Sequence, residues 1–303
     1  MTVDQMVHVR VPATTANLGP GFDCLGLCLD LWNEVDISFQ GDSVQIEIQG
    51  EGEEFLPTDQ SNLIFQSLKH LAFAHQIELP AGIHIRCLNR IPVSSGLGSS
   101  SSAIIAGLAG GRKLLNVSLR NEQILELGYG LEGHLDNLAA CLFGGLTIAI
   151  KQNQSVKVSN IDILPLQTLI ALPDVSLSTR EARNALPKRI PFSDAVFNLS
   201  RTALLVSALC QADYDLLKAA MEDHLHQPYR LGLIPSAAEA LAAALDAGAS
   251  GAALSGAGPS VVAFLIEKDK GKVEEAMRLA FSTKGINTRM FHIQTSNQGT
   301  QVF

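Results

Sequence analysis

The length, composition and charge of the chain exclude several classes of protein. Its 303 residues suggest two domains and suffice to bury a substantial core without disulfides or structural metals. Hydrophobic residues make up 47% and charged residues 17%, which excludes disordered and collagen-like chains. Lys and Arg total 22 against 30 Asp and Glu, so the net charge is −8. Because no basic surplus exists to neutralise a phosphate backbone, we expect no nucleic-acid partner.

The cysteines and the apolar stretches bear on location. Five cysteines, none of them in a C-x-x-C pair, argue against a disulfide framework and against a cysteine-bound zinc ion. No uncharged apolar run approaches the roughly 18 residues that cross a bilayer. The first residues lack a basic region followed by an apolar run, so no secretory signal is visible. We expect a cytoplasmic globular protein with no membrane partner.

Apolar periodicity predicts the elements of the first half of the chain. Alternating apolar residues predict strands over 7–11, 35–39, 44–48, 83–88 and 144–150. Apolar residues three and four apart predict helices over 62–75, 103–115 and 120–130. Pro12 is expected to end the first strand, and Gly41-Asp42 supplies the turn between the second and the third.

A polar stretch at 151–159 is the candidate boundary between two domains, which we place at residues 1–155 and 156–303. Beyond it, strands are predicted near 168–172, on both sides of 256–259 and near 287–294. Helices are predicted from Ser178, which has capping-box spacing to Glu181, and near 192–210, 213–223, 235–247 and 270–284. Strands and helices mix without strict βαβ alternation, so we predict an α+β fold in two halves.

The strongest local signal is the glycine- and serine-rich stretch from Ile91 to Ala103, which runs into a predicted helix. Glycines let the backbone approach a ligand closely, and the first amides of a helix have no partner within it. The helix dipole adds about half a positive charge there, so such a turn suits phosphate oxygens. A hydroxyl in the turn can ligate a phosphate-bound Mg²⁺. The spacing matches neither GxxxxGK[ST] nor GxGxxG, and a flexible linker is the alternative.

Three stretches, in this order and spacing, resemble the GHMP kinase superfamily over nearly the whole chain. They are Val11–Gly26, Pro92–Ala103 and Leu254–Ser260. Within this superfamily the chain resembles the homoserine kinase family, on the segments Glu132–Asn137 followed by Gly144-Gly145, Ser178–Arg183 and His226–Arg230. That family usually has Pro where this chain has Leu135, while the polar positions around it are intact.

The resemblance implies a fold and a reaction. The fold would join an N-terminal domain like the second domain of ribosomal protein S5 to a C-terminal ferredoxin-like domain, with nucleotide and substrate meeting between them. The reaction would convert ATP and L-homoserine into ADP and O-phospho-L-homoserine on the threonine route, with ATP and Mg²⁺ as cofactors. A homodimer is expected from the family alone.

The resemblance also assigns a nucleotide site and a metal site. The residues expected to bind ATP are Asn62, Pro92, Val93, Ser94, Ser95, Gly96, Leu97, Gly98, Ser99, Ser100, Ser101 and Ser102. Asn62 either contacts the adenine or only caps a helix. Ser100 is the expected Mg²⁺ ligand together with Glu126, which precedes Asp136 by the separation that this family shows. Glu132 is the competing carboxylate.

A zwitterionic amino acid needs a cation for its carboxylate and an anion or amide for its ammonium. Arg183 and Arg230 suit the carboxylate because a guanidinium offers two parallel donors, although arginines are most often surface residues. The other expected substrate contacts are Asn17, Asp23, His134, Asp136 and Gly256. Asn17, Asp23 and Asp136 suit the ammonium and hydroxyl end, and Asn17 and Asp23 are also common turn formers.

Phosphoryl transfer needs positioning and charge neutralisation more than covalent help from the protein. The expected catalytic residues are Asp136, Thr179 and Asn17. We assign Asp136 to substrate positioning first and to general base catalysis second, and Thr179 to orienting the reacting hydroxyl.

Two alternative functions differ in what they demand of the same residues. A mevalonate- or shikimate-type kinase of the same superfamily binds a substrate with a carboxylate and no amine, which leaves Asp23 and Asp136 poorly explained. A non-catalytic nucleotide-binding sensor would not need the intact set of Ser100, Glu126 and Asp136.

Overall fold

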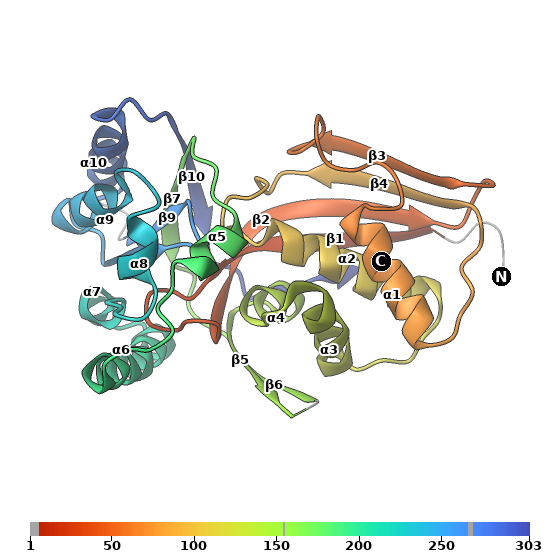
Figure 1. Ribbon diagram of the computed structural model, residues 1–303, viewed down its shortest axis with the longest axis horizontal. Helices are drawn as coiled ribbons and strands as arrows, with labels where there is room; N and C mark the ends of the chain where they lie inside the picture. Colours follow the sequence, from red (N-terminus) through yellow and green to blue (C-terminus); the bar gives the residue numbers. More distant parts are fainter. Residues whose placement is uncertain (1–5, 154, 266–268) are drawn as a thin grey trace.

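Two β-sheets follow one another along the long axis of the molecule, each with helices packed against it (Figure 1). The computed structural model describes residues 6–153, 155–265 and 269–303. The first sheet has seven strands in the order β11-β1-β2-β4-β3, with β5 paired to β2 and β6 paired to β5. Its strands are β1 (Met6–Ala16), β2 (Leu25–Ser38), β3 (Val44–Gly50), β4 (Ile83–Asn89), β5 (Leu146–Gln152), β6 (Ser155–Ile161) and β11 (Gln301–Val302).

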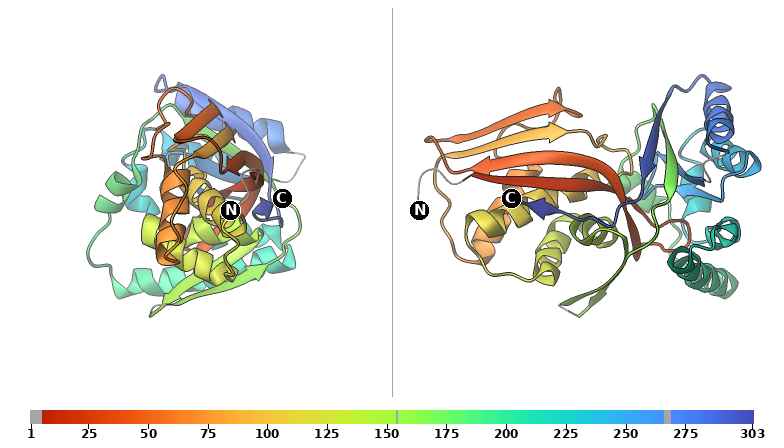
Figure 2. Two further views of the ribbon diagram at one scale, coloured as in Figure 1. Left: turned by 90° about the vertical axis from the view of Figure 1, so that its right-hand side faces the viewer. Right: turned by 180° about the vertical axis from the view of Figure 1, so that it is seen from behind.

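Four helices lie together on one side of the first sheet (Figures 1 and 2). They are α1 (Leu63–Ala74), α2 (Ser99–Leu114), α3 (Asn121–Glu132) and α4 (Asp136–Phe143). Leu68 of α1 and Ile104 of α2 pack with Val9 and Ile37 of the sheet in one buried cluster. A Cβ atom on Gly107 of α2 would lie 2.3 Å from the backbone oxygen of Ile64, so the small residues of α2 let α1 approach closely.

The second sheet has four antiparallel strands in the order β10-β7-β9-β8. They are β7 (Gln167–Pro173), β8 (Gly251–Leu254), β9 (Val261–Leu265) and β10 (Thr288–Gln294). The helices of this part are α5 (Thr179–Asn184), α6 (Phe192–Gln211), α7 (Leu217–Ala220), α8 (Gln227–Leu231), α9 (Ala237–Asp246) and α10 (Lys270–Ser282), with a 3₁₀ turn η1 at Tyr214–Leu216. Figure 1 shows α9 and α10 on the side of this sheet away from the first.

A buried cluster joins the two parts. Leu25 of the first sheet and Leu97 of the glycine-rich loop pack in it with Leu205 of α6 and Phe264 of the second sheet. Because apolar burial is the main stabilising term of a fold, this shared core holds the loops between the two sheets in a defined position.

The α+β class and most predicted elements are confirmed. β1 does not end at Pro12 as predicted. It continues to Ala16 because its register on β2 shifts between Pro12 and Ala13, an irregularity that accommodates a residue without an N–H donor. The predicted helix over 213–223 is also wrong, since this segment forms only η1 and the short α7. Sequence periodicity missed the short elements α4, α8 and β11.

The polar stretch that suggested a domain boundary forms the β5–β6 hairpin of the first sheet. The chain therefore passes from one sheet to the other between Ile161 and Gln167, several residues after the predicted division at 155/156, and β11 returns to the first sheet. The two domain ranges themselves stay a prediction. Within the described parts of the chain, no helix combines the length and apolar character needed to span a bilayer.

Candidate active site

A cavity of about 500 Å³ opens where the two sheets meet. It is lined by the loop after β1, the glycine-rich loop before α2, the starts of α4 and α5, and the turn between β8 and β9. Its lining includes Asn62, Leu56, Pro57 and Val93 as well as Asp23, Arg183 and Arg230. One cavity thus receives residues that the sequence assigns separately to nucleotide and to substrate.

The glycine-rich loop places the start of α2 at the cavity. Gly98 is the N-cap of α2 with φ +73°, and no side chain caps this end. A Cβ atom on Gly98 would lie 2.0 Å from Thr14 Oγ1, so both the backbone conformation and the close packing require glycine here. The uncapped amides at the start of α2 are therefore available to an anion.

Most of the predicted nucleotide residues line the cavity, and three do not. Those that line it are Asn62, Val93, Ser94, Ser95, Gly96, Gly98, Ser99, Ser100 and Ser102. Leu97 is fully buried in the core between the two parts. Pro92 accepts a hydrogen bond from Ser95 Oγ at 2.7 Å through its carbonyl, and Ser101 is buried behind the loop.

Asn62 combines the two roles that the sequence left open. Its side-chain oxygen accepts from the Ile64 N–H at 2.9 Å and caps α1, and its amide nitrogen donates to the Pro57 carbonyl at 2.8 Å. The residue also lines the cavity.

The carboxylate beside Ser100 is Glu132 and not Glu126. Ser100 Oγ donates to Glu132 at 2.7 Å, and Ser101 Oγ donates to the other oxygen of the same carboxylate at 3.1 Å. Glu126 accepts from the Val156 N–H at 3.2 Å and does not line the cavity. Six residues along a helix amount to about 9 Å and a turn of roughly 240°, so α3 cannot present both carboxylates at one place.

The oxygen donors of Ser100 and Glu132 fit a Mg²⁺ ion, which prefers hard oxygen ligands and usually takes few of them from the protein. Across the described ranges, no group of three or more His, Cys, Asp or Glu side chains is arranged to hold a metal ion.

His134 and Asp136 form a hydrogen-bonded pair at the start of α4. His134 Nδ1 lies 2.8 Å from Asp136 Oδ1, and its Nε2 lies 3.6 Å from Glu132. Burial by itself lowers the pKa of His134, but the hydrogen bond to Asp136 and the charges of Asp136 and Glu132 outweigh it and raise the pKa above its ordinary value. The same Asp136 oxygen accepts from the Asn137 N–H at 2.8 Å, which holds the carboxylate in place.

Asp23 and Arg183 come together from distant parts of the chain. Two guanidinium nitrogens of Arg183 donate to the two carboxylate oxygens of Asp23, at 2.9 and 2.7 Å. The hydrogen bond to Asp23 raises the pKa of Arg183. Asn17 fixes the conformation of the loop after β1 that carries Asp23. Its side-chain oxygen accepts from the Asp23 N–H at 3.0 Å, and its amide nitrogen donates to the Gly256 carbonyl at 2.8 Å.

Arg230 is a cation that is almost fully buried, with 2% of its surface exposed. Burial, and after it the charge of Arg183, lowers the pKa of Arg230 to about 10. The guanidinium lies over the Phe22 ring at 5.1 Å and donates to the Gly256 carbonyl at 3.2 Å. Thr179, the first residue of α5 after the Ser178 cap, also lines the cavity.

Sequence reasoning gave no individual role to three residues of the site. Phe22 lies under Arg230 and His226, and Thr14 Oγ1 donates to Asn137 Oδ1 at 2.7 Å beside Gly98. Phe22, Thr14 and Asn137 all lie within stretches that carried the family resemblance, and that was the signal available in the sequence.

Comparison with known proteins agrees with this geometry. Residues 62–145 match the family model "GHMP kinases N terminal domain" and residues 205–283 match "GHMP kinases C terminal". The fold is that of a GHMP kinase, with its two-domain mixed α and β architecture.

Full-length relatives define the family more closely. The chain is 42% identical to homoserine kinases of Desulfitobacterium hafniense and Moorella thermoacetica, over 98% of this chain and 100% of each relative. A crystal structure of homoserine kinase from Cytophaga hutchinsonii is 31% identical, with a TM-score of 0.86 over 100% of this chain and 99% of the other. The chain belongs to the homoserine kinase family. A mevalonate kinase of L. major, 14% identical with a TM-score of 0.73 over 96% of both chains, shares the fold.

Proposed function

We propose that this protein transfers the γ-phosphoryl group of ATP to the side-chain hydroxyl of L-homoserine, in threonine biosynthesis. The observation that carries the proposal is one cavity that joins the open N-terminus of α2 to the oppositely charged pair of Asp23 and Arg183. The first feature suits a nucleoside triphosphate, and the second suits both ends of an amino acid.

The phosphate end uses backbone and side chains of the glycine-rich loop. The amides that follow Gly98 contact the phosphate oxygens, and Ser100 with Glu132 would hold the Mg²⁺ ion. When bound, this ion neutralises charge on the phosphates. Since Glu132 accepts a hydrogen bond from Ser100, the oxygen atoms of the two side chains lie together.

At the substrate end of the cavity, binding of homoserine replaces the ion pair of Asp23 and Arg183 by two ion pairs with the substrate. In the structure, the Asp23 carboxylate and the Arg183 guanidinium form an ion pair. A bound homoserine turns Arg183 toward its carboxylate, which Arg230 also contacts, and leaves Asp23 for its ammonium group. Asp136, oriented by His134, positions the hydroxyl, and Thr179 contacts it from α5.

A coupled ADP-release assay on purified protein tests the proposal with L-homoserine, 4-hydroxybutyrate, mevalonate, shikimate, L-serine and L-threonine. Homoserine should exceed the substrates without an amine by about 100-fold in kcat/KM, since they offer no cation to the Asp23 carboxylate. Serine and threonine should react poorly because their hydroxyl lies one carbon nearer the anchored α-carbon. Comparable kcat/KM for homoserine and an amine-free acid would refute the substrate assignment.

A cytoplasmic location and a homodimer remain predictions. Light scattering during size-exclusion chromatography measures the mass of the assembly directly. A mass of one chain at assay concentration would contradict the dimer.

A further inference from the structure

The Arg230 guanidinium has three hydrogen-bond partners within the protein. Its Nε donates to the Ala182 carbonyl at 3.3 Å, and its Nη1 donates to the Gly256 carbonyl at 3.2 Å and lies 3.2 Å from His226 Nδ1. Among the residues that the structure describes, Nη2 has no hydrogen-bond acceptor, and Arg230 lines the cavity. These contacts leave one end of the guanidinium for a ligand.

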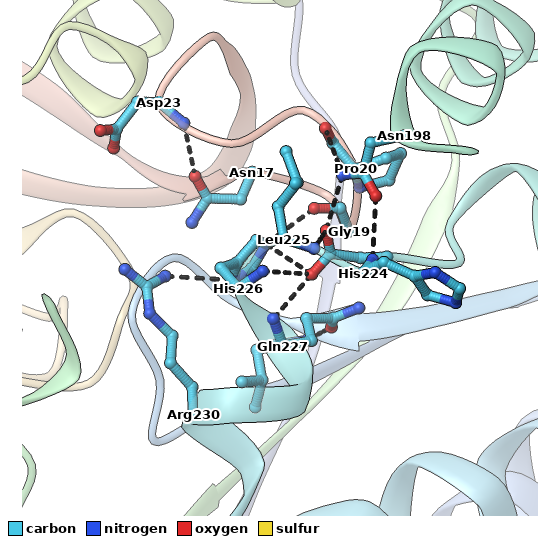
Figure 3. Close-up of polar contacts among 12 residues, drawn as sticks. Asn17, Gly19, Pro20, Asp23, Asn198, His224, Leu225, His226, Gln227 and Arg230 are labelled. Carbon is cyan, nitrogen blue, oxygen red and sulfur yellow. Dashed lines mark hydrogen bonds and ion pairs between the residues drawn. The ribbon is translucent and has the colours of Figure 1, made fainter. Parts of the chain in front are cut away.

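His226 lies between Arg230 and the loop that carries Asn17, Gly19 and Asp23 (Figure 3). Its Nε2 lies 2.7 Å from the Gly19 carbonyl oxygen. A guanidinium only donates and a carbonyl only accepts, so these two partners require an unprotonated Nδ1 and a protonated Nε2. Burial lowers the pKa of His226 despite the opposing charge of Asp223, which agrees with a neutral ring.

The backbone of the segment that carries His226 is anchored by Asp223, whose Oδ2 also lies 3.5 Å from the ring's Nε2. The buried carboxylate of Asp223 accepts from the backbone N–H groups of His226 and Gln227, at 3.0 and 2.6 Å, at the start of α8. Asn198 of α6 donates to Asp223 at 2.7 Å and to the Pro20 carbonyl at 3.3 Å. The backbones of α8 and of the loop at 17–23 are therefore joined by α6, and the His226 ring is left to orient the Arg230 side chain.

We propose that His226, as the neutral tautomer with the proton on Nε2, is a positioning residue that holds the Arg230 guanidinium toward the substrate carboxylate and ties it to the loop of Asn17 and Asp23. The role of Arg230 in this inference rests on the proposed function. Phe22 stacks on the His226 ring at 5.1 Å and covers the Arg230 guanidinium at 5.1 Å, so the three side chains form one packed unit.

Two amide variants separate the two hydrogen bonds of the ring. His226→Asn puts an amide oxygen near the position of Nδ1 and keeps the acceptor for Arg230. His226→Gln puts an amide nitrogen near Nε2, keeps the donor to Gly19 and loses that acceptor. His226→Ala removes both, and His224→Asn is the matched control because His224 stacks on Phe197 outside the cavity.

The homoserine KM should rise by about 10-fold or more in His226→Gln and His226→Ala and stay within about 3-fold in His226→Asn. The KM for ATP, and kcat at saturating homoserine, should stay close to those of His224→Asn. A general loss of structure would move all of these constants together. An unchanged homoserine KM in His226→Gln, or a His226→Asn variant as impaired as His226→Ala, would overturn the proposal.

Imidazole ¹⁵N NMR of the unaltered, substrate-free protein gives a readout that needs no activity. His226 should show a protonated Nε2 and an unprotonated Nδ1 near neutral pH, and the opposite tautomer or a doubly protonated ring would overturn the proposal. If the unaltered protein does not phosphorylate homoserine, the proposed function fails while the NMR result still decides the tautomer. If the alanine variant does not fold, the Asn and Gln variants decide.

Discussion

The ion pair between Arg183 and Asp23 makes a quantitative prediction for Arg183→Gln. In the native protein the guanidinium donates to both oxygens of Asp23, at 2.9 and 2.7 Å, and we propose that the substrate carboxylate takes over these donors. Glutamine removes the charge and the paired donors, and it leaves Asp23 without a cation in the empty site.

The expected loss is smaller than that for a fully buried arginine. Removing one partner of a desolvated charge pair costs about 2–5 kcal/mol. Both side chains are 37% exposed, and binding of substrate to the native protein must first break a pair worth about 0–1 kcal/mol at such exposure. The variant has no such pair to break, so the net loss is about 1–5 kcal/mol, or roughly 5- to 5,000-fold in kcat/KM.

Steady-state ADP release with varied homoserine at saturating ATP measures this loss. Arg183→Lys should fall between the native protein and Arg183→Gln, because lysine keeps the charge without the two parallel donors. A folded Arg183→Gln variant with the native homoserine KM would refute the reasoning. An equal rise in the KM for ATP would also refute the reasoning, because we propose that Arg183 contacts homoserine and not the nucleotide.

Three further predictions concern the metal, a titrating pair and a glycine. Glu132→Gln should lower kcat by about 100-fold, while Glu126→Gln should keep kcat within about 2-fold. The measurement is ADP release at graded Mg²⁺ concentrations, and a larger loss in Glu126→Gln would contradict the assignment. His134→Asn should lower the unfolding free energy more near about pH 6 than near about pH 9 in urea titrations. The pKa of His134 is raised in the folded protein, so the protonated ring stabilises the fold at low pH and this stabilisation is lost as the pH rises through that pKa. An equal loss at the two pH values would contradict a stabilising pair of His134 and Asp136. Gly98→Ala should lower the unfolding free energy by at least about 1 kcal/mol, because the residue has a φ of +73° and its new Cβ would lie 2.0 Å from Thr14 Oγ1. A melting temperature equal to that of the native protein would contradict this.

Features of the site that depend on local sequence were predictable. Ser178 and Glu181 form the capping box that their spacing indicates. This capping box begins α5, the helix that carries Arg183. The glycine-rich loop leads into α2 as expected. Gly98 adopts the left-handed conformation, which costs little free energy because glycine has no side chain. In both places the information lies within a few consecutive residues.

Features that depend on tertiary contacts were not predictable in the same way. Both Glu126 and Glu132 lie on α3, and the choice between them depends on how α3 is rotated against the start of α2. The helix expected over 213–223 ends at Ala220 because the Asp223 carboxylate accepts from the N–H groups that start α8 instead. Helical periodicity carries no information about that competition.

The Gly256 peptide shows why three distant motifs must coincide for this chemistry. Its carbonyl accepts from Asn17 Nδ2 at 2.8 Å and from Arg230 at 3.2 Å, and its N–H donates to the Ala16 carbonyl at 3.1 Å. The neighbouring Ser255 Oγ donates to the Gly96 carbonyl at 2.7 Å. One turn thereby sets the separation between the guanidinium that we propose binds the substrate carboxylate and the loop that we propose binds the phosphates. Because that separation is built into backbone contacts, we expect the site to select substrates by the length of the carbon chain between carboxylate and hydroxyl, since a shift of about 1 Å suffices to slow transfer by about 100-fold.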